Sequence, residues 1–191
     1  MATVLTALIQ DFTTTHTVTS IAKSQNLSRV GAWKNLKKLE KSHLIQTKKI
    51  NEGKTSTGII TLDWQNPLTE KTLALELTEE STRNQRWRNA FQELEHQSSF
   101  LIIFGSILHS PKEAGDIDLL SVSNKKNLHQ IAETINKIQK SQSKKIHLTN
   151  LTEQELKQEI NSKPIIDAIK KGVILFGQEN FIKTIRSITK Q

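Results

Sequence analysis

The sequence contains no cysteine among its 191 residues. This absence excludes a disulfide framework, a thiolate metal site and a cysteine nucleophile, and it favours a reducing compartment. The sequence also has no apolar run of the roughly 18 residues that a membrane span needs. Its first ten residues lack the basic start that is typical of a signal peptide. We therefore expect a cytoplasmic protein with no membrane partner.

Hydrophobic residues are scarce, although not to a degree that indicates disorder. They make up 35% of the chain, against about 45–50% in ordinary globular domains. Leu, Ile, Val and Phe nevertheless recur with clear periods, so the chain can bury a core. At roughly 150 residues per domain, the length predicts one or two domains.

Positive charge is in excess, with 27 basic and 19 acidic residues and a net charge of +8. Residues 1–65 hold 9 basic and 4 acidic residues, residues 66–96 hold 4 and 6, and residues 97–191 hold 14 and 9. Two basic blocks therefore flank an acidic stretch. A basic surface favours nucleic acid or nucleotide phosphates as partners. The alternative is a lysine-rich surface that only keeps the protein soluble.

Residues 1–65 are predicted to form three short helices and a hairpin. The apolar helical faces are Leu5, Leu8, Ile9 and Phe12; Val18, Ile21 and Ala22; and Ala32, Leu36 and Leu39. Ser28 is a suitable N-cap for the third helix. Residues 46–50 and 58–64 have strand character, and a polar loop containing glycine separates them. Three helices followed by a hairpin is the order of a winged helix-turn-helix.

The third helix resembles the recognition helix of winged helix-turn-helix regulators, which implies that DNA is a partner. With its apolar residues inward, basic residues and a tryptophan occupy the outer faces. The resemblance assigns DNA binding to Arg29, Trp33, Lys34, Lys37, Lys38, Lys48, Lys49 and Lys54. The first three lie near the helix start, where base edges are reached, and the others suit phosphates. The alternative is a winged helix that contacts protein, with lysines that only solvate it.

The rest of the chain changes pattern twice. Asn66-Pro67 marks a boundary, and residues 69–96 are predicted to form one long helix, with loose apolar spacing between 78 and 86. The expected strands are 100–104, 117–122, 145–149 and 173–176, and the expected helices are 127–140, 153–160, 165–169 and 179–190. The prediction is an α+β protein with a winged helix-turn-helix (1–65), a connecting helix (66–97) and a mixed sheet flanked by helices (98–191).

One constellation of residues points to chemistry. Phe104-Gly105-Ser106 is followed, after nine residues, by Asp116-Ile117-Asp118. A glycine at the end of a strand lets phosphate oxygens approach the backbone, and Ser106 adds a hydroxyl donor. Asp116 and Asp118 alternate along a strand, so both carboxylates project from one face. Two carboxylates beside a phosphate cradle are typical of a Mg²⁺ site for phosphoryl transfer. The alternative is an ordinary turn beside a solvated strand edge.

These residues resemble the DNA polymerase beta superfamily of nucleotidyltransferases, especially its small minimal branch, over roughly residues 100–185. The stretch from Lys171 to Phe181 also resembles the ending common in such proteins. The resemblance implies that Gly105 and Ser106 bind a nucleoside triphosphate. It makes Asp116 and Asp118 the catalytic and metal-binding pair for Mg²⁺. It also implies transfer of a nucleoside monophosphate to a hydroxyl on protein or nucleic acid. Relatives are often antitoxins that modify a partner toxin, and a homodimer is a further expectation.

The sequence departs from the superfamily at its third carboxylate. The corresponding strand, 145–150, offers only His147 and Thr149 at that place. His147 can act as a base or weak ligand, or it is simply a packed or exposed residue. Glu153 and Glu155 are substitutes, although they equally suit the N-terminal dipole of a helix. Nucleotide binding is thus better supported than turnover. The alternative function is a non-enzymatic transcription regulator or antitoxin whose degenerate domain senses nucleotide or mediates dimerisation.

Overall fold

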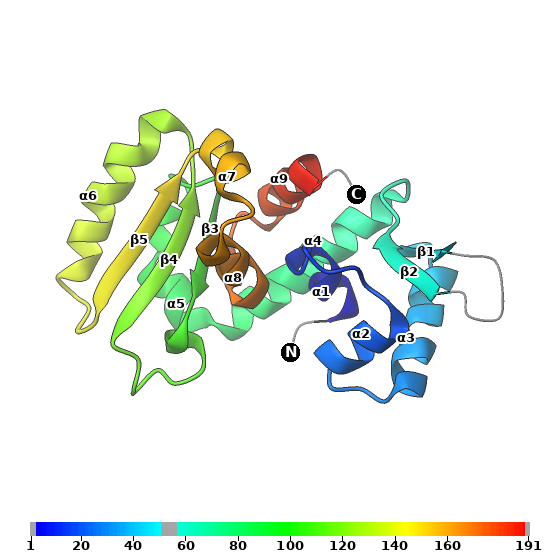
Figure 1. Ribbon diagram of the computed structural model, residues 1–191. Helices are drawn as coiled ribbons and strands as arrows, with labels where there is room; N and C mark the ends of the chain where they lie inside the picture. Colours follow the sequence, from blue (N-terminus) through cyan, green and yellow to red (C-terminus); the bar gives the residue numbers. More distant parts are fainter. Residues whose placement is uncertain (1–2, 51–56, 190–191) are drawn as a thin grey trace. The chain divides into compact units, whose positions relative to one another are not determined.

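The computed structural model describes residues 3–50 and 57–189 and has an α+β fold (Figure 1). Its contacts divide the chain into two units, one extending to Glu76 and including Thr189, the other Leu77–Ile188. The boundary falls inside helix α4 (Pro67–Arg83), so the predicted connecting segment is shared between the units. Within the described ranges, no helix has the length and apolar character needed to cross a membrane.

The N-terminal unit contains the predicted three helices and hairpin. The helices are α1 (Val4–Gln10), α2 (Val18–Ser24) and α3 (Arg29–Lys41), and the strands are β1 (Ile45–Ile50) and β2 (Thr57–Leu62). The two strands pair antiparallel, from Ile45 opposite Leu62 to Ile50 opposite Thr57. The expected order of helices and strands is confirmed, with bounds close to those predicted.

Local signals in the sequence explain where α2 and α3 begin and end. Thr17 accepts a hydrogen bond from the Ser20 amide, and Ser28 accepts one from the Gly31 amide at 3.0 Å, so both helices have N-caps. Asn26, between the helices, has φ 51°, a left-handed conformation that asparagine tolerates better than most residues. The capped turn fixes α3 against α2, where Ala32 and Leu36 are buried.

The predicted single helix over 69–96 is broken where its apolar spacing loosens. Helix α4 ends at Arg83, α5 runs Gln85–Ala90, and a short 3-10 helix, η1, runs Gln92–Leu94. At the break, the Asn84 side chain donates to the Glu80 carbonyl at 3.0 Å, which competes with the helical pattern. The break allows Trp87, Phe91 and Leu94 to be buried in one hydrophobic cluster.

The second unit is built on a mixed four-stranded sheet of order β5-β4-β3-β6. Its strands are β3 (Phe100–Phe104), β4 (Asp116–Val122), β5 (Lys145–Leu151) and β6 (Val173–Phe176). The helices around it are α6 (Leu128–Gln139), α7 (Glu153–Glu159), α8 (Lys163–Lys171) and α9 (Gln178–Thr189). Strands β4 and β5 are parallel because α6 connects them, whereas β3 pairs antiparallel with β4 and β6. Figure 1 shows α6 beside β5 at the sheet edge.

Each face of this sheet has its own hydrophobic partners. On one face, Ile117 and Leu119 pack in a cluster with Trp87 of α5 and Ile135 of α6. On the other, Phe100 meets Phe181 of α9 edge-on, with ring centroids 5.5 Å apart. Because side chains alternate along a strand, the even-numbered residues of β4 lie on this second face. Asp116 and Asp118 are therefore directed away from the cluster formed with α5 and α6.

Candidate metal and nucleotide site

Three potential metal ligands converge at one end of the second face. Asp116, Asp118 and His147 each offer a ligand atom, and these atoms all lie within 4.8 Å of one another. The parallel pairing of β4 with β5 explains the convergence, since it places His147 directly opposite Asp118. Both carboxylates are half-buried and the imidazole is exposed. The predicted Asp116–Asp118 pair is thus joined by one of the proposed substitutes for the third carboxylate.

The site concentrates negative charge that the protein does not neutralise by hydrogen bonding. Burial raises the pKa of Asp118, the neighbouring Asp116 charge raises it further, and His147 opposes them. Among residues 3–50 and 57–189, no side chain or amide donates a hydrogen bond or forms a salt bridge to either carboxylate. Their lone pairs are therefore open to an external cation.

Gly105 brings the backbone against these carboxylates. Phe104, the last residue of β3, pairs with Asp118, and Gly105 follows with φ 85° and ψ −166°. A Cβ at Gly105 would overlap Oδ2 of Asp118 and force that carboxylate to shift, and the positive φ would strain any residue other than glycine. Ser106 is exposed and begins the short 3-10 helix η2 (Ser106–Leu108), whose first amides have no acceptor within that helix. The structure thus places the predicted nucleotide-binding pair beside the predicted metal-binding pair.

The chemistry of the donor set fits a divalent cation. Metal–ligand bonds to carboxylate oxygen and imidazole nitrogen are about 2.0–2.4 Å, so ligands of one ion lie within about 5 Å of each other. The separation of the three groups meets this condition. In the deprotonated forms that coordinate a metal ion, the two carboxylates supply two negative charges and the imidazole supplies an uncharged nitrogen donor. Asp116, Asp118 and His147 are the residues that could hold such an ion.

Glu153 and Glu155 do not belong to this group. The parallel register continues to Val122 opposite Leu151, so both glutamates follow the far end of β5. Leu151 alone is about 13 Å along the strand from His147, at 3.3 Å per residue. Glu155 instead caps α7, accepting hydrogen bonds from the Thr152 amide (2.7 Å) and hydroxyl (2.8 Å), which lower its pKa. Of the two roles that the sequence leaves open for these glutamates, their position at the start of α7 supports the interaction with the helix N-terminus and not replacement of the third carboxylate.

Lys145 is a site neighbour that the sequence reasoning missed. It pairs with Asp116 across β4 and β5, and it is exposed. Paired residues of parallel strands lie on the same face, so Lys145 flanks the carboxylates on the face that a phosphate would approach. Only the register of β5 against β4 reveals this, and no pattern in the sequence specifies that register.

The outer surface of α3 is the candidate nucleic-acid interface. Arg29, Trp33, Lys34, Lys37 and Lys38 are all exposed, as predicted. At 100° per residue, Arg29 and Lys38 lie on opposite flanks of the helix, with Lys34 and Lys37 between them. Trp33 and Arg29 line a hollow of about 280 Å³ with Val18 and Val30. Val30, 62% exposed, was missed, although its spacing of four residues before Lys34 would have placed it on the same face.

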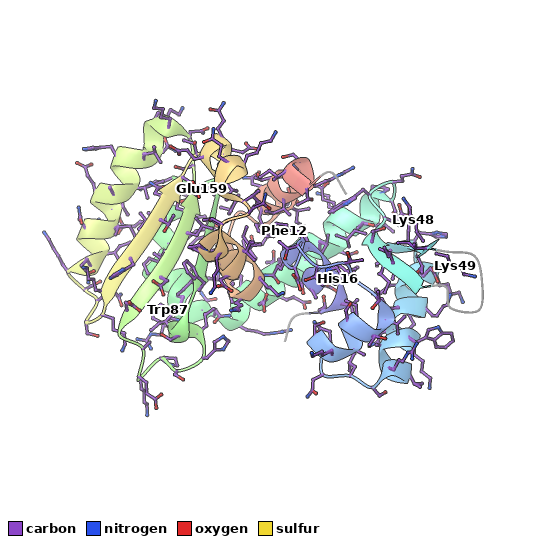
Figure 2. All side chains as sticks on the ribbon, viewed as in Figure 1. Phe12, His16, Lys48, Lys49, Trp87 and Glu159 are labelled. Carbon is purple, nitrogen blue, oxygen red and sulfur yellow. The ribbon has the colours of Figure 1, made fainter. Side chains whose placement is uncertain are left out.

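The hairpin carries two of the three predicted wing lysines. Lys48 and Lys49 are exposed on β1 and are labelled in Figure 2. As consecutive strand residues, they project to opposite faces of the hairpin. Lys54 lies outside the described residues. Lys37 differs from the other lysines of α3 because it forms a salt bridge with Glu40 at 2.7 Å.

The fold and the site together define an α+β protein in which a three-helix and hairpin unit precedes a mixed sheet bearing a candidate cation site. No protein-family model, curated protein or solved structure matches the chain. Its function is therefore inferred from its own residues.

Proposed function

We propose that this protein binds DNA through its N-terminal unit and binds a nucleoside triphosphate with a divalent cation through its second unit. The observation that carries the proposal is the convergence of the ligand atoms of Asp116, Asp118 and His147 within 4.8 Å, beside a glycine whose replacement would displace the Asp118 carboxylate. An Asp-x-Asp pair next to a Gly-Ser turn is the arrangement that the resemblance to nucleotidyltransferases predicts.

Each residue has a role that follows from its position. Asp116 and Asp118 hold the cation, which supplies charge neutralisation for the phosphates and for transfer of a nucleoside monophosphate. Gly105 leaves room for phosphate oxygens at the backbone, and Ser106 offers its amide and hydroxyl to them. Lys145, on the same face, suits a third phosphate contact. The acceptor in this proposal is a hydroxyl of a protein or nucleic acid.

The N-terminal unit is suited to duplex DNA. The centre of the exposed α3 face carries Lys34 and Lys37, with Arg29 and Lys38 on its flanks. A helix that enters the major groove presents its central outer residues to base edges and its flanks to the two phosphate strands. Because Lys48 and Lys49 project to opposite faces of the hairpin, one of them adds a backbone contact of the kind a wing makes. This arrangement supports base contacts from Lys34 and phosphate contacts from Lys38, as the sequence suggests. It differs for Arg29, whose place on a flank suits a phosphate contact and not the base contact expected from its position near the helix start.

A specific observation favours a second candidate function, a regulator that binds nucleotide without turnover. The position opposite Asp118 holds His147, not a carboxylate. A neutral imidazole adds no negative charge to the metal site, and once it coordinates the cation its lone pair is no longer free to take a proton from an attacking hydroxyl. The regulator would bind triphosphate and cation, and release no pyrophosphate.

The test uses the full chain with radiolabelled nucleoside triphosphates and either Mg²⁺ or Mn²⁺. We expect cation-dependent binding in a filter assay that Asp116→Asn abolishes. The matched control, Asp167→Asn, changes a carboxylate of α8 that pairs with Lys171 at 2.7 Å, and it should bind normally. Pyrophosphate release and label transfer to protein or RNA indicate the enzyme, whereas binding without release indicates the regulator. Equal binding by wild type and Asp116→Asn contradicts both.

A band-shift titration over a range of salt concentrations tests the DNA proposal. Binding should weaken steeply as salt rises, because several lysines displace counterions from the phosphates. Absence of a shift even at low salt would contradict DNA binding and leave protein contact as the role of α3.

A further inference from the structure

We infer that His147 makes the site selective for a divalent transition cation, represented here by Mn²⁺, over Mg²⁺. This inference rests on the proposed cation and nucleotide site, and it specifies which class of ion that site takes. It departs from the Mg²⁺ that the sequence resemblance implies, because the structure identifies an imidazole as the third ligand.

The first argument is ligand chemistry. Mg²⁺ requires near-ideal octahedral oxygen coordination at about 2.0–2.1 Å, and it is poorly served by nitrogen. Imidazole suits the later first-row ions such as Fe²⁺, Ni²⁺ and Zn²⁺. Mn²⁺ binds most weakly in that series and is served mainly by carboxylates, but as a softer ion it accepts a nitrogen donor more readily than Mg²⁺ does, so it is the most demanding probe of the class. Asp116 and Asp118 supply oxygen to either ion, so the discriminating ligand is His147. With His147 bound, a transition ion has three protein ligands where Mg²⁺ has two.

The second argument is the charge around the site. A carboxylate at position 147 would give the three ligands a total charge of −3, whereas an imidazole leaves the total charge at −2. Lys145, exposed on the same face and opposite Asp116, reduces the local negative potential further. A hard ion such as Mg²⁺ is held mainly by charge. The missing third carboxylate and the nearby Lys145 therefore weaken the binding of Mg²⁺ more than the binding of an ion that also gains a coordinate bond to nitrogen.

The third argument is the position of His147 itself. Its backbone is fixed by the continuous β4–β5 pairing from Asp116–Lys145 to Val122–Leu151, and it is directly opposite Asp118. Among the described residues, no hydrogen bond or salt bridge holds the imidazole in another role. The ring is therefore available to complete the group with the two carboxylates.

The experiment titrates the cation-free full chain with Mn²⁺ and follows free Mn²⁺ by electron paramagnetic resonance, then displaces it with Mg²⁺. Pulsed measurements on bound Mn²⁺ detect coupling to imidazole ¹⁴N. The variants are His147→Ala and His147→Asp. His129→Ala is the matched control, since His129 is exposed on α6 and pairs only with Glu133 at 3.7 Å among the described residues.

We expect wild type and His129→Ala to bind Mn²⁺ at least about tenfold more tightly than Mg²⁺ and to show ¹⁴N coupling. His147→Ala should lose the coupling and most of that preference, and His147→Asp should lose the coupling and bind Mg²⁺ more tightly than wild type. Bound Mn²⁺ without nitrogen coupling, or an unchanged preference for Mn²⁺ over Mg²⁺ in His147→Ala, overturns the inference. The proposed function still stands in that case if cation binding requires Asp116. Absence of binding by both ions overturns the two together.

Discussion

Replacing Asp118 by asparagine should stabilise the cation-free protein. Asp116 and Asp118 place two carboxylates within 4.8 Å of each other, with no hydrogen bond to either from the described residues. Two unit charges at this separation repel by about 1 kcal/mol in a water-like dielectric, and by more in a protein-like one. We adopt the smaller value because Asp118 is only half-buried and solvent screens the pair. Asparagine keeps the shape of the side chain and removes the repulsion.

The pH dependence of this effect has a definite sign. Burial and the Asp116 charge raise the pKa of Asp118 above its ordinary value of 3.8. A raised carboxyl pKa means that the folded state favours the protonated form of Asp118. The contribution of Asp118 to the free energy of unfolding is therefore most favourable below about pH 3.8, and it falls as pH rises through the folded-state pKa. Above that pKa the penalty is constant. The advantage of Asp118→Asn should therefore be complete at neutral pH and vanish in acid.

Urea unfolding followed by Trp87 fluorescence measures this effect within the second unit. A Trp33→Phe/Trp64→Phe background leaves Trp87, labelled in Figure 2, as the only reporter of the three tryptophans. Without cation, the free energy of unfolding of Asp118→Asn should exceed that of wild type by about 1 kcal/mol. At Mn²⁺ one hundred times its Kd, wild type should gain about 2.7 kcal/mol and the variant little, which reverses the order.

The comparison with Asp167→Asn decides whether the reasoning holds. The pKa of Asp167 is lowered, chiefly by its hydrogen bond to Lys171, so its replacement removes a favourable interaction and should not stabilise the protein. Two results together would refute the reasoning. In chelator, Asp118→Asn would be no more stable than wild type, and on addition of Mn²⁺ both proteins would gain the same free energy of unfolding. Asp116 and Asp118 would then not be two repelling carboxylates that share a cation.

The remaining predictions concern the glycines and the DNA-binding helix. Gly105→Ala should destabilise the protein by at least about 1 kcal/mol, because alanine at φ 85° is strained, and it should abolish triphosphate binding measured by calorimetry. Gly177→Ala, at φ 75° and against the Ser99 carbonyl, should also lower the urea midpoint yet leave binding by the folded protein intact; equal binding loss in both would argue that Gly105 acts only on folding. In salt-dependent band shifts, Lys38→Ala should reduce the salt slope by about one, whereas Lys34→Ala should alter sequence preference; identical effects would contradict the division between groove and flank.

Most of the elements follow from local signals that the sequence carries by itself. Thr17 and Ser28 each cap a helix whose apolar residues repeat at helical spacing, and strands 100–104 and 173–176 match their predicted bounds because continuous apolar runs leave few alternatives. The alternation of Asp116 with Ile117 likewise places its carboxylate on the strand face opposite that of Ile117. These features depend on interactions between residues a few positions apart, which is why the pattern alone predicts them.

Only the tertiary structure decided what stands beside Asp118. The identity of the third ligand depends on how β5 lies against β4, and a parallel pair separated by α6 has a register that no local pattern specifies. Had β5 paired two residues earlier, Lys145 would face Asp118 and His147 would lie opposite Leu120, away from both carboxylates. The register also placed Lys145 beside Asp116 and sent Glu153 and Glu155 to the far end of the sheet. The break at Asn84 is similar, because burial of Trp87 and Phe91 in the sheet cluster, together with a side chain that bonds to the Glu80 carbonyl, outweighs the helical tendency of the intervening residues.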